Sequence, residues 1–135
     1  MDILTYEYLL QGLKDHNAKA SENYGNEVLR LPPKTPKYPI SILREIRNSS
    51  TGYNTCYQRV ADVGYRVDIF AKTKGKITHD VIARTIAKEI DEYMTGVNLS
   101  RISKNENELI DEQGAYYHII LTYSGNLDEN RLRFI

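Results

Sequence analysis

The sequence predicts an α+β domain in which a four-stranded, mainly antiparallel sheet carries two helices on one face. Apolar residues recur at helical spacing in two segments, and they alternate with polar residues in others that are typical of strands. The predicted order is α-β-β-α-β-β, so strands follow one another instead of alternating with helices, as in α+β folds. The 135 residues fit a single domain, 1–135, with a core that needs no disulfides.

The first predicted helix, over residues 2–14, is followed by a segment of a different character. Residues 17–39 are polar and rich in turn formers, and they contain all four prolines of the chain. Proline removes a backbone donor and fixes φ, which excludes a regular helix or a central strand. We therefore expect a long loop or arm at 17–39. Long loops in compact domains are often functional, so this arm is a candidate to contact a neighbouring subunit.

Two strands are predicted after the arm, at residues 40–47 and 60–72, with a turn cluster at 48–54 between them. In the first strand, Ile40, Ile42 and Ile46 share one face. The second strand has a clear period of two, with Val63, Tyr65, Val67 and Ile69 on one face and Arg66 and Asp68 on the other.

The second half of the chain predicts a helix over about 79–95, ended by Gly96, and strands at 97–103 and 115–123. A polar, acidic loop is expected at 105–114. The residues predicted to be buried together are Val67, Ile69, Ile82, Ile86, Ile90, Ile119 and Leu121.

Composition narrows the class of protein. Lys plus Arg is 18 and Asp plus Glu is 18, so the chain lacks the electrostatic footprint of a dedicated nucleic-acid binder and associates without long-range self-repulsion. There are 11 Tyr, 2 Phe and no Trp. Tyrosine suits half-buried sheet faces and interfaces, although it can also replace Phe in a small core.

The single cysteine, Cys56, excludes a disulfide framework and a multi-thiolate metal site within one chain, and it fits a reducing compartment. The N-terminal residues lack the pattern of a signal peptide, and no apolar run reaches the roughly 18 residues of a membrane span. We therefore expect a protein made in the cytosol that leaves it only as part of a larger assembly.

Each possible catalytic or metal site has a simpler explanation. Gly75-Lys76 resembles the end of a phosphate-binding loop, but Phe70 and Ile77 replace the glycine and the hydroxyl residue that the motif requires. The three histidines, His16, His79 and His118, lie in different predicted elements, without ligands at helical spacing. Cys56 has only Arg59 nearby. We expect no catalytic residue, no cofactor, no metal and no enzyme activity. A small hydrolase is an alternative only if a pocket brings His79 or His118 beside a carboxylate.

The one dense basic run consists of Lys72, Lys74 and Lys76. These lysines are candidates to face DNA, because ammonium groups neutralise backbone phosphates. The simpler interpretation is a solvated turn.

Several segments resemble the small tail-terminator, or tail-to-head joining, proteins of long-tailed phages. They are YRVDIFAK at 65–72, IARTIAKEID at 82–91, GVNLSRI at 96–102 and YYHIILTY at 116–123. The likeness covers roughly residues 38–125 and consists of a pattern of strands and a helix. It implies a ring, hexameric in that family, at the head-proximal end of the tail in the virion, assembled in the host cytoplasm.

The resemblance also implies the partners. The ring ends tail-tube polymerisation and docks onto the head connector or a neck protein, and DNA passes through its lumen. Independently of the resemblance, the prolines just before the first strand favour an arm that lies on an adjacent subunit or on the tail tube, through Pro32, Pro33, Pro36 and Tyr38, with Tyr38 as anchor. The alternative is a solvent-exposed connector between helix and sheet. Two alternatives remain open: a neck or head-closure protein, and a small nucleic-acid-binding module that uses residues 72–76 and sheet tyrosines as stacking platforms.

Overall fold

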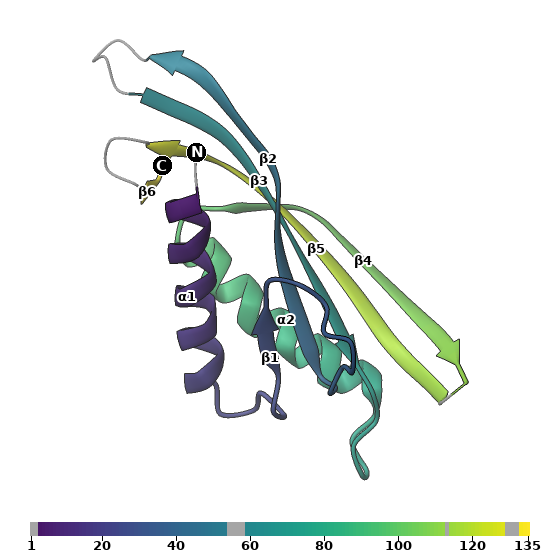
Figure 1. The fold of residues 1–135 in the computed structure, drawn as a ribbon. Helices are drawn as coiled ribbons and strands as arrows, with labels where there is room; N and C mark the ends of the chain where they lie inside the picture. The colour runs from purple at the N-terminus through teal and green to yellow at the C-terminus, as the bar shows by residue number, and fades with distance from the viewer. Residues whose placement is uncertain (1–2, 54–58, 113, 129–132) are drawn as a thin grey trace.

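The computed structural model describes residues 3–53, 59–112, 114–128 and 133–135, and Cys56 lies outside them (Figure 1). In chain order, the elements are α1 (Ile3–Lys19), β1 (Glu27–Leu29), β2 (Ile40–Tyr53), β3 (Arg59–Ala71), α2 (His79–Gly96), β4 (Ser100–Asp111), β5 (Gly114–Asp128) and β6 (Arg133–Phe134). The sheet order is β1-β2-β3-β5-β4, and β6 pairs with the end of β5. Only β1 and β2 run parallel among these pairs. The mixed, mainly antiparallel class is thus confirmed.

Both helices pack on the same face of the sheet, as predicted (Figure 1). The seven residues expected in the core are each no more than 2% exposed. Leu9, Leu10 and Leu13 add the buried side of α1. The apolar stripe of α2 therefore packs on alternate residues of β3 and β5. This is the arrangement predicted by apolar residues that repeat every 3.6 positions in the helix and every 2 positions in the strands.

The end of α2 differs from the prediction. Gly96 is the last helical residue, and the left-handed residue is Asn98, with φ of 72°. The backbone N–H of Asn98 donates to the carbonyl of Thr95, and that of Leu99 donates to the carbonyl of Met94. These two bonds form a Schellman motif, and asparagine tolerates the left-handed conformation that it needs.

The sheet has more and longer strands than the four predicted. β1 lies inside the segment 17–39 predicted to be a loop, because Val28 is buried and three residues suffice to pair with β2. The loop predicted at 105–114 is wrong, since β4 continues to Asp111 and pairs with β5. β2 likewise runs through the polar cluster at 48–54 as far as Tyr53. In all three places, the strand is held by backbone hydrogen bonds to a neighbouring strand. Its residues lack the apolar alternation by which a strand is recognised in a sequence.

The face of the sheet opposite the helices is partly covered by residues 31–39, which we call the arm. Ile40 and Ile42 are buried on this face, whereas Leu43 points to the helices and Ile46 is half exposed. Asp68, predicted on the face away from the core, is also buried here, at 4% exposure. The described helices include none long and apolar enough to cross a bilayer.

Candidate functional site

The most accessible feature of the sheet is its edge strand β4. Among the described strands it pairs only with β5, and its side chains are exposed except for the half-buried Ser103. Three of them are large and apolar: Ile102, Leu109 and Ile110 are 58%, 39% and 82% exposed. The β4–β5 hairpin also projects away from the two helices (Figure 1). An open edge of this length is a template for another strand.

Polar and charged side chains of α2 hold β4 in place on the helix side. His79 Nε2 lies 2.6 Å from Glu108 Oε1, and Arg84 Nε lies 3.1 Å from Glu106 Oε1. Further along, Arg101 lies 3.6 Å from Asp91. The contacts span most of the strand, so the edge is supported along its length. The acidic residues predicted to sit in a solvated loop instead connect the edge strand to the helix.

The opposite side of the sheet has a second open edge. β1 pairs with three of the fourteen residues of β2, which leaves residues 43–53 with β3 as their one neighbour among the described strands. The Tyr6 hydroxyl donates to the carbonyl of Leu43 at 2.5 Å and marks the start of this free stretch. The two free edges, β4 and the end of β2, are therefore similar in length.

The arm carries the residues predicted to form an interface. Pro32, Pro33 and Pro36 are exposed, and they line a cavity of about 150 Å³ whose floor includes Ile40, Ile42, Phe70 and Tyr116. The Tyr38 ring lies 6.3 Å from that of Tyr116, measured between centroids. Burial raises the pKa of Tyr38. Within this chain, Tyr38 therefore anchors the arm to its own sheet, and its contact with a neighbouring subunit or the tail tube stays a prediction.

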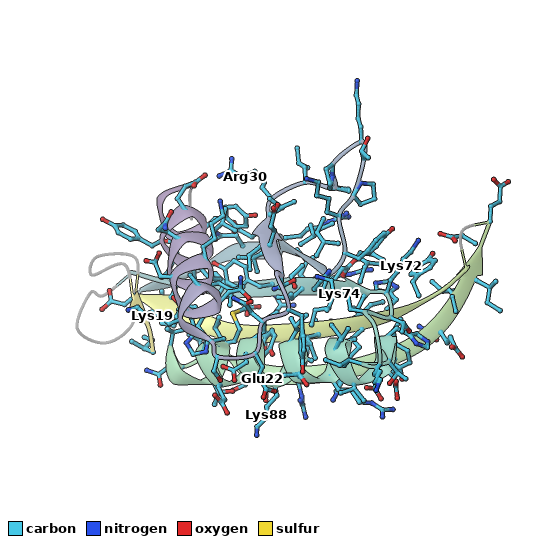
Figure 2. All side chains as sticks on the ribbon, turned by 90° about the horizontal axis from the view of Figure 1, so that it is seen from below. Lys19, Glu22, Arg30, Lys72, Lys74 and Lys88 are labelled. Carbon is cyan, nitrogen blue, oxygen red and sulfur yellow. The ribbon has the colours of Figure 1, made fainter. Side chains whose placement is uncertain are left out.

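The three lysines predicted to face DNA do not share one environment. Lys72 is half-buried, with its Nζ 4.8 Å from the centre of the Tyr38 ring and 3.8 Å from Asp111. Lys74 donates to the carbonyl of Tyr24 at 2.6 Å, while Lys76 is exposed (Figure 2 labels Lys72 and Lys74). Two of the three ammonium groups are therefore engaged within the chain, and DNA contact stays a prediction.

Each histidine has a carboxylate nearby, which the sequence did not reveal. His16 Nε2 lies 3.4 Å from Glu89 on α2, and the ligand atoms of His16, Glu89 and Glu92 lie within 4.8 Å of one another. His118 Nε2 lies 3.7 Å from the buried Asp68. These pairs join different elements, so spacing along the chain carried no signal for them. That the chain holds no metal stays a prediction.

The hydrolase alternative requires a histidine that lies beside a carboxylate and in a pocket. His79 meets the first of these two requirements. It lies beside Glu108, and Thr73 Oγ1 is 3.4 Å from its Nδ1. However, that hydroxyl accepts the backbone N–H of His79, as a helix-capping group does. His79 lines neither the cavity under the arm nor one of about 340 Å³ beside Tyr93 and Phe134. The simplest role of this cluster is to fix the start of α2 to β4.

Comparison with known proteins identifies a similar fold. In sequence, the chain matches no family model and no curated protein. Among solved structures, it is similar to a chain from the "Virion of native gene transfer agent (GTA) particle", with a TM-score of 0.59 and 10% identity. The match covers 91% of this chain and 96% of that one. The two chains therefore share a fold over nearly their whole lengths.

Proposed function

We propose that this chain is a structural protein of a phage-like virion that forms a ring at the head-proximal end of the tail. There it ends polymerisation of the tail tube and joins the tail to the head connector. The observation that carries the virion role is the fold shared with a chain of a gene transfer agent particle over 91% of this chain. No catalytic step is part of the proposal.

The two free strand edges support the ring. β2, β3, β5 and β4 are successive antiparallel neighbours, so β4 runs opposite to β2. A second copy placed beside the first, in the same orientation, presents the free end of its β2 to β4. The junction is then antiparallel, like those within the sheet. Such a head-to-tail interface closes into a ring when the rotation between copies allows it.

The chain also suits a lumen through which DNA passes. Its formal net charge is zero, and two of the three lysines at 72–76 are engaged in contacts within the chain. A surface of this kind neutralises few phosphates and holds DNA weakly. In contrast, a dedicated nucleic-acid module would need those lysines free and the sheet aromatics open, whereas Phe70 stacks on His118 at 4.2 Å and Tyr38 packs near Tyr116.

Native mass spectrometry of the purified chain at micromolar concentration, alone and with tail-tube protein, tests the proposal. A closed oligomer in either sample is expected. A strict monomer in both contradicts the ring, and a salt-sensitive shift of labelled DNA by that monomer would favour the nucleic-acid module.

One pair of variants tests the edge itself. Ile102→Lys places a charge on the exposed edge strand, which blunts strand pairing. The matched control is Val81→Lys, on an exposed position of α2. Surface changes of this kind alter the free energy of unfolding by about 0.5 kcal/mol or less. We expect the edge variant to stay monomeric with an unchanged melting temperature, and the control to assemble. Equal assembly of both variants would contradict pairing through β4.

A further inference from the structure

Resting on the proposed ring, we infer that the arm of one copy receives the tip of the β4–β5 hairpin of the next copy. The tip is defined here as residues 108–112, and the arm as residues 31–39. The occupant is therefore a second copy of this chain.

The two segments lie where such a junction brings them together. β4 ends at Asp111, at the end of the sheet where β2 begins, because β2, β3, β5 and β4 pair in register there. The arm leads from β1, on the open β2 side, to the start of β2. When β4 of one copy runs antiparallel along β2 of the next, its last residues reach β1 and the arm of that copy.

Apolar side chains are exposed on both segments. On the tip, Ile110 is 82% exposed and Leu109 is 39% exposed. On the arm, Leu31 is 71% exposed and stands beside the exposed Pro32 and Pro33. Because successive residues of a strand point to opposite faces, Leu109 and Ile110 project on opposite sides of the tip. Each side of the tip can therefore place one apolar side chain against an arm. Burying these surfaces against each other removes apolar area that each copy exposes alone.

The charges of the two segments are complementary. The arm contributes Lys34 and Lys37, both exposed and with no ion-pair partner in the described part of the chain. The tip contributes Glu108, Asp111 and Glu112, of which Glu112 likewise has no partner there. Opposite charges on facing patches set the register and the orientation of an interface. A basic, apolar arm and an acidic, apolar tip thus fit each other better than either fits a copy of itself.

The arm is also pre-ordered to receive the tip. Proline limits its conformations, and Tyr38 anchors its end on Tyr116 and beneath the ammonium group of Lys72. Docking onto an ordered segment costs less conformational entropy than docking onto a free loop. The prolines therefore have a role in assembly beyond connecting β1 to β2.

Cross-linking between two different variants tests the contact. In a Cys56→Ser background, Ile110→Cys is mixed with Pro33→Cys, and one of them carries a tag that separates the heterodimer by size. Because each chain has a single thiol, a mixed disulfide forms only between copies. We expect a strong heterodimer band after mild oxidation, and little of it when Val81→Cys replaces Pro33→Cys. Equal yields in the two mixtures would overturn the inference.

A charge exchange provides a second measurement. Lys34→Glu with Lys37→Glu should raise the concentration for half-assembly on the order of tenfold, as two exposed ion pairs do. Adding Glu112→Lys to that variant should recover part of the loss. If wild-type rings form but neither the charges nor the cross-link matter, the arm contact is wrong and the ring stands. If the wild type never assembles, alone or with tail-tube protein, the ring and the arm contact both fail.

Discussion

Asp68 is a buried carboxylate whose removal should have a measurable and pH-dependent effect on stability. It is 4% exposed and accepts two hydrogen bonds from Arg66, at 2.6 and 3.1 Å. Hydrogen bonds to charged groups contribute roughly 1.5–3 kcal/mol, and breaking a fully buried pair costs about 3–5 kcal/mol. The Arg66 side chain is 39% exposed and can turn to water. We therefore expect Asp68→Asn to lower the free energy of unfolding by about 2 kcal/mol at pH 7.

The pKa of Asp68 fixes the pH range of this effect. Burial would raise that pKa, but the interactions with His118 and Arg66 outweigh burial, so it lies below the ordinary value. An unfolded aspartate titrates near pH 3.9, at about its ordinary value. The stabilisation is therefore complete above that pH and disappears as the pH falls through the lower, folded-state pKa. The difference between Asp68→Asn and the parent chain should shrink accordingly.

Urea unfolding of both chains between pH 7 and pH 3 provides the measurement. The matched control is Asp62→Asn, on the same strand, because Asp62 and Arg47 form a pair in which both side chains are about 40% exposed. Exposed pairs are worth roughly 0–1 kcal/mol, so this change should be small at every pH. A loss at Asp68 no larger than at Asp62, or one that is constant with pH, would refute the reasoning.

Substitutions at three further positions test the packing, one hydrogen bond and the end of α2. Ile86→Ala should cost about 2–5 kcal/mol and Ile86→Val about 0.5–1.5 kcal/mol in urea unfolding, because Ile86 is 2% exposed; similar values for the two would refute full burial. Tyr123→Phe should cost about 1 kcal/mol, since it deletes the 2.8 Å hydrogen bond to Asp91, which keeps Arg101 as a partner; an unchanged melting temperature would contradict this. Asn98→Ala should cost about 1 kcal/mol, while Asn98→Gly should be neutral or better, because the site has positive φ; the reverse order would exclude the Schellman end of α2.

The helices and strands in which buried residues recur at regular spacing on one face could be predicted from the sequence. The stripe of α2 and the alternation in β3 and β5 identified the core, because burial imposes a period on residue type. β4 lacked that signal: nearly all of its side chains are exposed, so nothing in its composition distinguishes it from a polar loop. β1 is only three residues long and depends on a partner 13 positions away, from Glu27 to Ile40.

The candidate site was predictable in part. The prolines and Tyr38 identified the arm, because proline lacks a backbone N–H and is therefore excluded from helix interiors and central strands. The tip was missed, since Leu109 and Ile110 stand between acidic residues and resemble a solvated loop. The contacts of His16, His79 and His118 with carboxylates were missed because each joins two elements that only the tertiary structure brings together.

The two open edges are chemically different, and in the proposed ring this would give every incomplete assembly a polarity. One end always presents β4 and the other always presents the free part of β2. A copy whose β4 is blocked still joins a growing arc through its own β2. That end of the arc then accepts no further copy, so the arc cannot close, although its β2 end stays open. Such a copy prevents ring closure, so a small fraction of Ile102→Lys protein mixed with wild type would leave many rings incomplete. The number of copies in the closed form is then set by the curvature of one junction, repeated until the first and last edges meet.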